Sequence, residues 1–218
     1  MSGAGTNGVA DTLRAGAAAL GVALSEGQLE QLLAYLALLQ KWNRVYNLTA
    51  VRDPQDMLTH HLLDSLAAVA PLLRHTGGRP AKVLDVGSGG GLPGVVLAIC
   101  RPELEVRCVD TVGKKAAFIQ QVAASLKLPH LQGVHARVET LAGPFDVIAS
   151  RAFAALPDFV AWSRQALAPG GVWMAMKGKL PQAEIDDLPA DVQVFHVEPL
   201  QVPGLDAERC MVWLRPRA

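Results

Sequence analysis

The stretch Val83-Leu84-Asp85-Val86-Gly87-Ser88-Gly89-Gly90-Gly91-Leu92-Pro93-Gly94 decides the fold of this chain. An apolar strand that carries an acid runs into a glycine-rich loop. Pro93 then suits the first position of a helix, where its missing N–H costs nothing. Glycine permits positive φ angles and lets a ligand approach the bare backbone, and the free N–H groups of the helix would face an anion. The pattern predicts a nucleotide-type cofactor loop on a doubly wound α/β sheet.

Two classes of cofactor loop fit these glycines. Gly89, Gly91 and Gly94 satisfy the dinucleotide spacing G-x-G-x-x-G. A count that starts at Gly87 gives acid-x-G-x-G-x-G, which resembles the loop of class I methyltransferases. The second interpretation is favoured because Gly87 follows the strand at once, and because Asp85 would repel a pyrophosphate but suits the ammonium and sulfonium groups of S-adenosylmethionine. The predicted cofactor contacts in this loop are Asp85, Gly87, Gly89 and Gly91.

A second acid follows the next expected strand, residues 104–110. Asp110 lies 23 residues past Gly87, and an acid about 20 residues after the glycine loop binds ribose hydroxyls in Rossmann-type sites. The alternative is that Asp110 caps the helix expected at 113–127. The two roles are compatible, so Asp110 is a candidate cofactor contact.

Length and composition predict a globular chain. Of its 218 residues 50% are hydrophobic and 18% charged, which suits one domain of ordinary size plus an extension. No signal-peptide pattern is present, and Ala15–Leu24 is too short to span a bilayer. Three cysteines form no closed disulfide set, and neither they nor the six histidines have a metal-ligand spacing. We expect a cytoplasmic monomer that binds neither membrane nor metal.

The charge is zero overall but unevenly distributed. Residues 77–151 carry 9 Lys and Arg against 6 Asp and Glu, a net of +3, whereas residues 1–76 sum to −1 and residues 152–218 to −2. Positive charge is therefore concentrated in the segment with the glycine loop, as a surface that faces RNA would require. The excess is small, so RNA binding should be modest and sensitive to salt.

The first 76 residues read as a helical extension. Ser25 and Gln28 form a capping box, and leucines at helical spacing then continue to about Trp42. Asp53-Pro54 starts another helix, which the apolar pattern extends through 58–73. No strand is expected before residue 81, so we divide the chain into a helical extension, 1–76, and a methyltransferase domain, 77–218. For the Gly- and Ala-rich first 24 residues we leave open whether they are ordered or disordered.

After residue 80, strand and helix patterns alternate. Strands are expected at 81–86, 104–110, 131–136 and 145–150, with helices at 93–101, 113–127 and 155–167. Pro169-Gly170-Gly171 reads as a turn before a fifth strand, 172–176, and two strands without a long helix between them follow at 192–199 and 209–214. The predicted fold is α/β, Rossmann-like, with a seven-stranded, mostly parallel sheet that ends in an antiparallel pair.

The ends of the strands limit the chemistry. Ser150-Arg151-Ala152-Phe153 lacks the Asn/Asp-Pro-Pro-Tyr/Phe motif of amine-directed methyltransferases, and neither the fourth nor the fifth strand ends in a cysteine nucleophile. Methylation of guanine N7 needs neither this motif nor a cysteine, because the N7 lone pair is free and the enzyme has only to position the base. Arg151 is a candidate for the methionine carboxylate or an RNA phosphate, or else pairs with a helix acid. Lys177 and Lys179 are candidate phosphate contacts, or solvated lysines.

Five blocks in one order resemble a known family. They are Asn47–Pro54, His61–Ser65, Asp85–Gly94, Ser150–Phe153 and Lys177-Gly178. Together they are similar to the bacterial ribosomal RNA small subunit methyltransferase G family, also called glucose-inhibited division protein B. The resemblance runs from about residue 25 to the C-terminus, and its first two blocks are more specific than the glycine loop because no generic cofactor fold requires them.

The resemblance implies N7 methylation of one guanosine in the decoding-region loop of 16S rRNA, with S-adenosylmethionine as donor. It implies cofactor contacts at Gly87, Leu92, Val138, Glu139 and Arg151. It also suggests a role for polar residues of the extension, either as a surface that closes over the cofactor or meets RNA, or as a plain helical cap. These residues are Arg44, Asn47, Arg52 and His61.

Two other functions remain open at this point. The chain could methylate another substrate on the same fold, or it could bind the cofactor without turnover as a ribosome-assembly protein. Whether the substrate is naked RNA, a precursor particle or the small ribosomal subunit also stays open.

Overall fold

A seven-stranded sheet forms the centre of the molecule in a computed structural model, which describes residues 3–217 and the side chains of 8–53 and 56–217. The strand order is β3-β2-β1-β4-β5-β7-β6, with β7 antiparallel to both of its neighbours and the other pairs parallel. The strands are β1 Lys82–Val86, β2 Glu105–Asp110, β3 Leu131–His135, β4 Phe145–Arg151, β5 Leu167–Lys177, β6 Val192–Pro199 and β7 Cys210–Pro216. The predicted fold class, including the antiparallel C-terminal pair, is confirmed.

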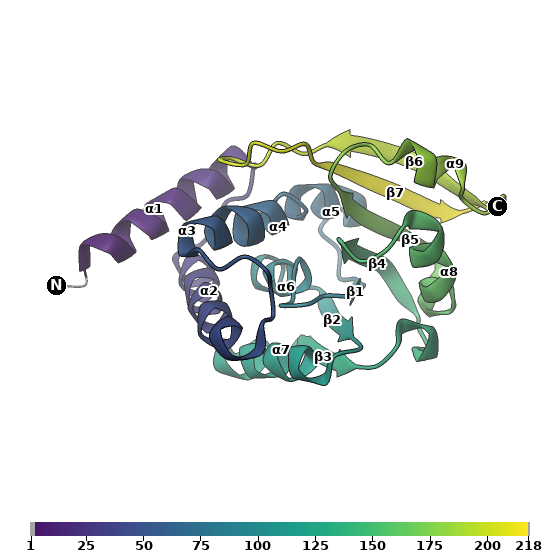
Figure 1. The fold of residues 1–218 in the computed structure, drawn as a ribbon. Coiled ribbons are helices and arrows are strands. Elements are labelled where there is room, and N and C mark those ends of the chain that lie inside the picture. The colour runs from purple at the N-terminus through teal and green to yellow at the C-terminus, as the bar shows by residue number, and fades with distance from the viewer. Residues whose placement is uncertain (1–2, 218) are drawn as a thin grey trace.

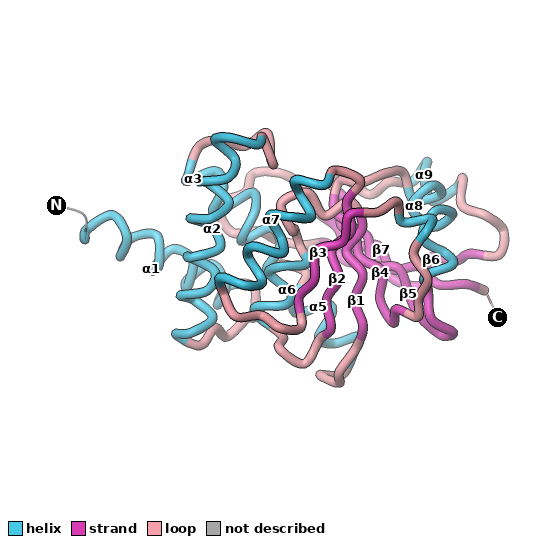
Figure 2. The backbone as a smooth tube through the Cα atoms, turned by 90° about the horizontal axis from the view of Figure 1, so that it is seen from below, coloured by secondary structure: helices cyan, strands magenta, loops and turns pink. Residues whose placement is uncertain are grey.

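Helices cover both faces of the sheet. Figure 2 shows α2, α5, α6 and α7 on one side and α8 and α9 on the other, while α1 projects outward from the first group. The α-helices are α1 Gly3–Ala19, α2 Glu26–Tyr46, α3 Pro54–Met57, α4 Asp64–Leu66, α5 Val69–Thr76, α6 Gly94–Cys100, α7 Gly113–Ser125, α8 Leu156–Ser163 and α9 Gln182–Asp186. The shorter helical turns are the π-helix η1 Leu58–Leu63 and the 3₁₀ turns η2 Val138–Thr140 and η3 Arg164–Ala166.

Helix α2 begins as its sequence predicts. Ser25 Oγ accepts the N–H of Gln28, and the Gln28 side chain accepts the N–H of Ser25, which completes the capping box. The helix continues one turn beyond Trp42 and ends at Tyr46. Asn47 follows as its C-cap with φ +49°, in the left-handed region that asparagine tolerates.

Polar side chains of α2 reach across to the cofactor half. The Gln28 amide donates to the carbonyls of Ile99 and Cys100 at the end of α6, and Gln31 donates to the carbonyl of Leu126 after α7. These carbonyls have no partner within their own helices, so α2 satisfies them. One hydrophobic core also runs without interruption from α1 and α2 to β7, so the extension and the sheet pack as one body.

Three local expectations differ from the structure. For the first 24 residues the sequence leaves disorder as a possibility, whereas the structure has helix α1 there, with Leu13 and Ala17 buried. The helix expected over 58–73 is divided by η1 and by a break after α4. The expected turn Pro169-Gly170-Gly171 lies inside β5 as a bulge, because Leu167 pairs with Phe145 whereas Val172 already pairs with Val147.

Within residues 3–217 no helix is both long and apolar enough to cross a membrane. The same described part of the chain contains no cluster of three or more potential metal-ligating side chains.

Candidate functional site

The glycine loop joins β1 to α6 and follows the strand directly. Gly87, Gly89 and Gly91 have φ of +64°, +57° and +91°, a region that glycine occupies without strain. A Cβ added to Gly87 would overlap the Phe153 ring, and one added to Gly91 would overlap Val95. The loop therefore needs glycine for its backbone conformation and for close packing.

Asp85 lies beneath this loop. It is fully buried, and its Oδ2 accepts the N–H of Gly94 at 2.8 Å, at the start of α6. Burial raises the pKa of the Asp85 carboxyl to about 7. Asp85 does not line either of the cavities beside the loop. The structure thus places this acid as a support for the loop and helix start, and not opposite a ligand ammonium as the sequence led us to expect.

Two cavities flank the loop. The Asp110 cavity, of about 440 Å³, lies over the ends of β2 and β3 and includes Asp110, Val138 and Glu139. The Arg151 cavity, of about 480 Å³, lies over the ends of β4 and β5 and includes Gly89, Leu92, Arg151 and His61 among its lining residues. Both cavities share the backbone of Gly87 and Ala152. The two cavities therefore lie side by side along the carboxyl ends of the parallel strands, where doubly wound sheets bind their ligands.

Asp110 accepts hydrogen bonds from the backbone of two different loops. Its Oδ2 accepts the N–H of Gly89 at 3.1 Å, its Oδ1 accepts that of Val112 at 2.8 Å, and Lys115 Nζ lies 3.5 Å away. Asp110 thus fixes Val112, the residue that directly precedes α7, but among the described residues it accepts no hydrogen bond from a backbone N–H of the helix itself. A carboxylate has about four acceptor positions, so one remains for a ligand hydroxyl.

The other two predicted residues of the Asp110 cavity belong to η2. Val138 is buried and Glu139 is exposed, so the cavity has an apolar wall beside a carboxylate. Gly91, by contrast, lines neither cavity and serves the loop conformation described above.

Arg151 is paired with a helix acid, the alternative that its sequence position left open. Its Nη1 donates to Asp64 Oδ2 at 2.8 Å and to the His60 carbonyl at 2.7 Å. Asp64 is almost fully buried, and its second oxygen accepts from Arg209 Nε at 3.0 Å. Asp64, which lines the Arg151 cavity, is the member of this ion-pair group that sequence reasoning missed. The signal was its place in the specific block His61–Ser65.

His61, which we expected in a surface that closes over the cofactor or meets RNA, or else in a helical cap, lies in the wall of the Arg151 cavity. It is buried, and its Nε2 lies 2.8 Å from Thr49 Oγ1. Burial and the nearby Arg151 cation lower the pKa of His61 from 6.5 to about 4, so the ring is neutral at physiological pH.

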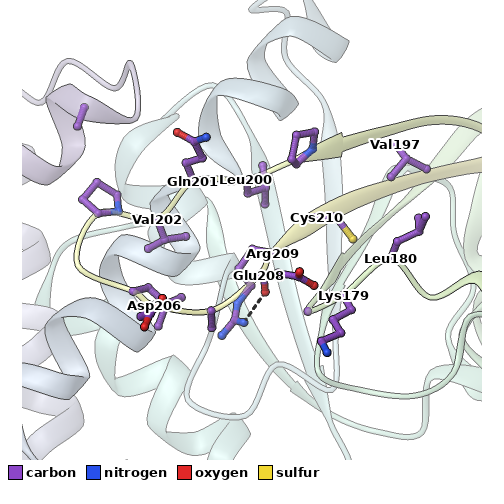
Figure 3. A pocket seen from close by; sticks show the side chains of 16 residues that line it. Lys179, Leu180, Val197, Leu200, Gln201, Val202, Asp206, Glu208, Arg209 and Cys210 are labelled. Carbon is purple, nitrogen blue, oxygen red and sulfur yellow. Dashed lines mark hydrogen bonds between the residues drawn. The ribbon is translucent and has the colours of Figure 1, made fainter.

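The two lysines at the end of β5 and just after it, Lys177 and Lys179, differ from each other. Lys177 lines the Arg151 cavity, but its Nζ donates to the Ala154 carbonyl and to Glu184 at 2.8 and 2.7 Å, so it is not a solvated lysine. Lys179 is exposed and lines a separate cavity of about 1050 Å³, formed mainly by the β6–β7 loop (Figure 3). Arg209 and the backbone of Gly178 border both this cavity and the Arg151 cavity.

The remaining polar candidates lie together elsewhere. Arg44, Asn47 and Arg52 line a smaller cavity of about 270 Å³ at the turn between α2 and α3. They are therefore a group distinct from His61, which lies in the wall of the Arg151 cavity.

Comparison with known proteins identifies the family. Residues 28–212 match the family model GidB, described as rRNA small subunit methyltransferase G. The chain belongs to this family. It is 72% identical over 214 residues to the ribosomal RNA small subunit methyltransferase G of Acidovorax sp. (strain JS42), which covers 94% of this chain and 95% of that protein. The protein of that name from Verminephrobacter eiseniae (strain EF01-2) is 61% identical and covers 100% of this chain and 99% of its own length.

Solved structures agree on the fold. A Burkholderia thailandensis 1,6-didemethyltoxoflavin-N1-methyltransferase, bound to 1,6-didemethyltoxoflavin and S-adenosylhomocysteine, superposes with a TM-score of 0.60 at 19% identity, covering 85% of this chain and 90% of that one. A Leishmania major SAM-dependent methyltransferase gives a TM-score of 0.59 at 15% identity and covers 83% of each chain. Family membership and fold together confirm that the chain is a methyltransferase with S-adenosylmethionine as its cofactor.

Proposed function

We propose that this protein methylates N7 of a guanosine in 16S rRNA, in the decoding-region loop of the small ribosomal subunit. One observation carries the choice of N7. Among its lining residues the Arg151 cavity has no cysteine, and its one carboxylate, Asp64, is occupied by two arginines. Such a cavity offers neither a nucleophile for a pyrimidine nor a free carboxylate for an exocyclic amine. Guanine N7 requires neither, because its lone pair is already available.

The residues beside the loop fit S-adenosylmethionine, which when bound supplies a methyl group on a positively charged sulfur. Asp110 has an acceptor position left for a ribose hydroxyl, and Glu139 adds a second carboxylate. Val138 provides an apolar surface for the adenine. Gly87 lines both cavities, so a ligand that extends along the strand ends would contact its backbone in each of them.

The chain then acts on the guanine by orientation. Arg151 is held by Asp64 and by the His60 carbonyl, so its guanidinium has a defined direction at the cavity wall. The methyl group that the cofactor would supply meets a guanine lone pair that carries no proton, so the methylated purine would carry a positive charge and the protein needs no general base. No proton has to leave. The neutral His61 ring places no additional cation beside the purine that becomes charged.

Nucleoside analysis tests the proposal. Small subunits from a strain that lacks this enzyme are incubated with the protein and labelled S-adenosylmethionine, and the RNA is treated with mild reduction and aniline. N7-methylguanosine makes the backbone cleavable at one site, whereas methylated exocyclic amines and C5-methyl pyrimidines survive. Labelled 16S rRNA that resists scission would refute the N7 assignment.

A variant pair tests the role of Arg151. Arg151→Ala should lower the rate of methyl transfer by roughly 100-fold, because a misplacement of about 1 Å has an effect of that size. Arg164→Ala is the matched control, since it also removes an arginine from an ion pair, with Asp191, but lies outside both cavities. Equal rates for the two variants would contradict the positioning role.

A further inference from the structure

A third cavity lies at the turn between α2 and α3, and we call it the Arg44 cavity. Its volume is about 270 Å³, and it contains two guanidinium groups and no carboxylate. Its lining residues are Gln40, Asn43, Arg44, Asn47, Arg52 and Met57. Arg44 and Arg52 are exposed and make no ion pair or hydrogen bond within the described part of the chain. A small concave site with two uncompensated cations is suited to an anion.

The absence of a counter-ion is not general in this protein. Six other arginines form ion pairs with carboxylates, namely Arg14, Arg74, Arg101, Arg151, Arg164 and Arg209. The chain has as many acidic as basic side chains. Five further arginines, Arg79, Arg107, Arg137, Arg215 and Arg217, also form no ion pair in the described part of the chain. Arg44 and Arg52 differ from the paired arginines and share one cavity whose lining has no carboxylate, so a bound anion from outside would balance their charge.

The wall of the Arg44 cavity is shared with the site of methyl transfer. Leu48, Thr49 and Val51, in the segment between α2 and α3, line the Arg151 cavity. Asn47 and Arg52, at the two ends of the same short segment, line the Arg44 cavity. A ligand group in one cavity is thus separated from a group in the other by a single stretch of backbone.

Hydrogen bonds hold this wall in place from both sides. The buried Asn43 donates from Nδ2 to the Val51 carbonyl at 3.1 Å and accepts the N–H of Thr49 at 2.8 Å. On the opposite side Thr49 Oγ1 lies 2.8 Å from His61 Nε2. The segment is thus bonded to α2 and to η1 at once, and these bonds restrain the wall between the two cavities.

We infer that the Arg44 cavity binds an internucleotide phosphate of the RNA strand whose guanine enters the Arg151 cavity. A guanidinium donates two parallel N–H groups to two oxygens of a phosphate, and the amides of Gln40 and Asn47 add further donors. Such a contact reads no base, but it sets the position of the strand relative to the reacting guanine. The identity of the strand rests on the proposed function, whereas the anion site itself rests on the lining of the cavity.

The double variant Arg44→Gln/Arg52→Gln tests this site. With small subunits as substrate its KM should rise about tenfold, while kcat at saturation and cofactor affinity stay unchanged. In binding to isolated 16S rRNA, the slope of log K against log salt should become shallower by about 1, the value for one lost phosphate contact. The control is Arg215→Gln/Arg217→Gln, which removes the same charge at the far end of β7 and should leave KM and slope unaltered.

The outcomes separate the two proposals. If the wild type methylates the subunit and the double variant keeps its KM and salt slope, the phosphate site is wrong and the proposed function stands. If the wild type transfers no methyl group but the double variant still shows the shallower slope, the function is wrong and the phosphate site stands. A loss of affinity for the intact particle without one for protein-free rRNA would assign the cavity to a ribosomal protein and overturn the inference.

Discussion

Replacement of Asp64 by asparagine should destabilise the protein far more than the loss of an ordinary surface ion pair. Its side chain is 4% exposed, and its two oxygens accept from Arg151 and Arg209, whose side chains are 17% and 24% exposed. Removing one partner of a fully buried pair costs roughly 3–5 kcal/mol. Because both arginines keep part of their hydration, we expect a loss of about 2–3 kcal/mol, which corresponds to roughly 5–10 °C in Tm for a chain of this size.

The assay is urea unfolding at pH 7.5, combined with calorimetry. The control Asp191→Asn removes the partner of Arg164 in an exposed pair and should leave Tm essentially unchanged. A double-mutant cycle with Arg209→Gln isolates the coupling across the shared carboxylate. If Asp64→Asn unfolds at the same urea concentration as the wild type, Asp64 does not organise the two arginines, and the positioning of Arg151 needs another explanation.

Three more results are expected. Gly87→Ala should abolish cofactor binding in calorimetric titration, because its Cβ would overlap the Phe153 ring at a residue with φ +64°; wild-type affinity would refute this. When the pH is lowered from 7 to 5, the free energy of unfolding of the wild type should fall by about 2 kcal/mol more than that of His61→Gln. The reason is that His61 has a pKa of about 4 in the folded protein and 6.5 in the unfolded chain, so that it takes up a proton on unfolding. Asp85, whose pKa is raised to about 7, has the opposite effect on stability, and it is present in both proteins, so the comparison removes it. Parallel pH profiles for the wild type and His61→Gln would contradict the prediction for His61. Asp110→Ala should weaken cofactor binding by about 1.5–3 kcal/mol and also lower Tm, because the carboxylate holds two backbone N–H groups; unchanged affinity would exclude a cofactor contact.

The sheet was predictable because its signals are local. Strand β1 is a short, mostly apolar run that ends directly before Gly87, β4 begins directly after Pro144, and the start of α2 follows from Ser25 and Gln28 alone. The turn expected at Pro169-Gly170-Gly171 was wrong for a non-local reason. Pairing with β4 on one side carries these residues along as a bulge, and no pattern within β5 itself contains that information.

The site was predictable in its backbone and less so in its side chains. The glycine loop and Asp110 lie where strand order and spacing place them. The pairing of Arg151 with Asp64 joins residues 87 positions apart, and the third member, Arg209, lies 145 positions from Asp64. Which acid meets which base depends on how η1 packs over the strand ends. For the same reason the burial of His61 could not be read from its polar character.

The contacts of α2 have a consequence for how the chain is synthesised. Gln28 and Gln31 bond to carbonyls that lie 71 to 95 positions later in the sequence, and the apolar stripe of α2 is covered by α6 and α7 from the same later part. Because translation proceeds from the N-terminus, this stripe leaves the ribosome long before its partners exist. Exposed apolar surface of this kind is prone to aggregation and is recognised by chaperones. The nascent extension therefore has to wait for α7 before it can be buried, which makes folding of this protein a late event in its translation.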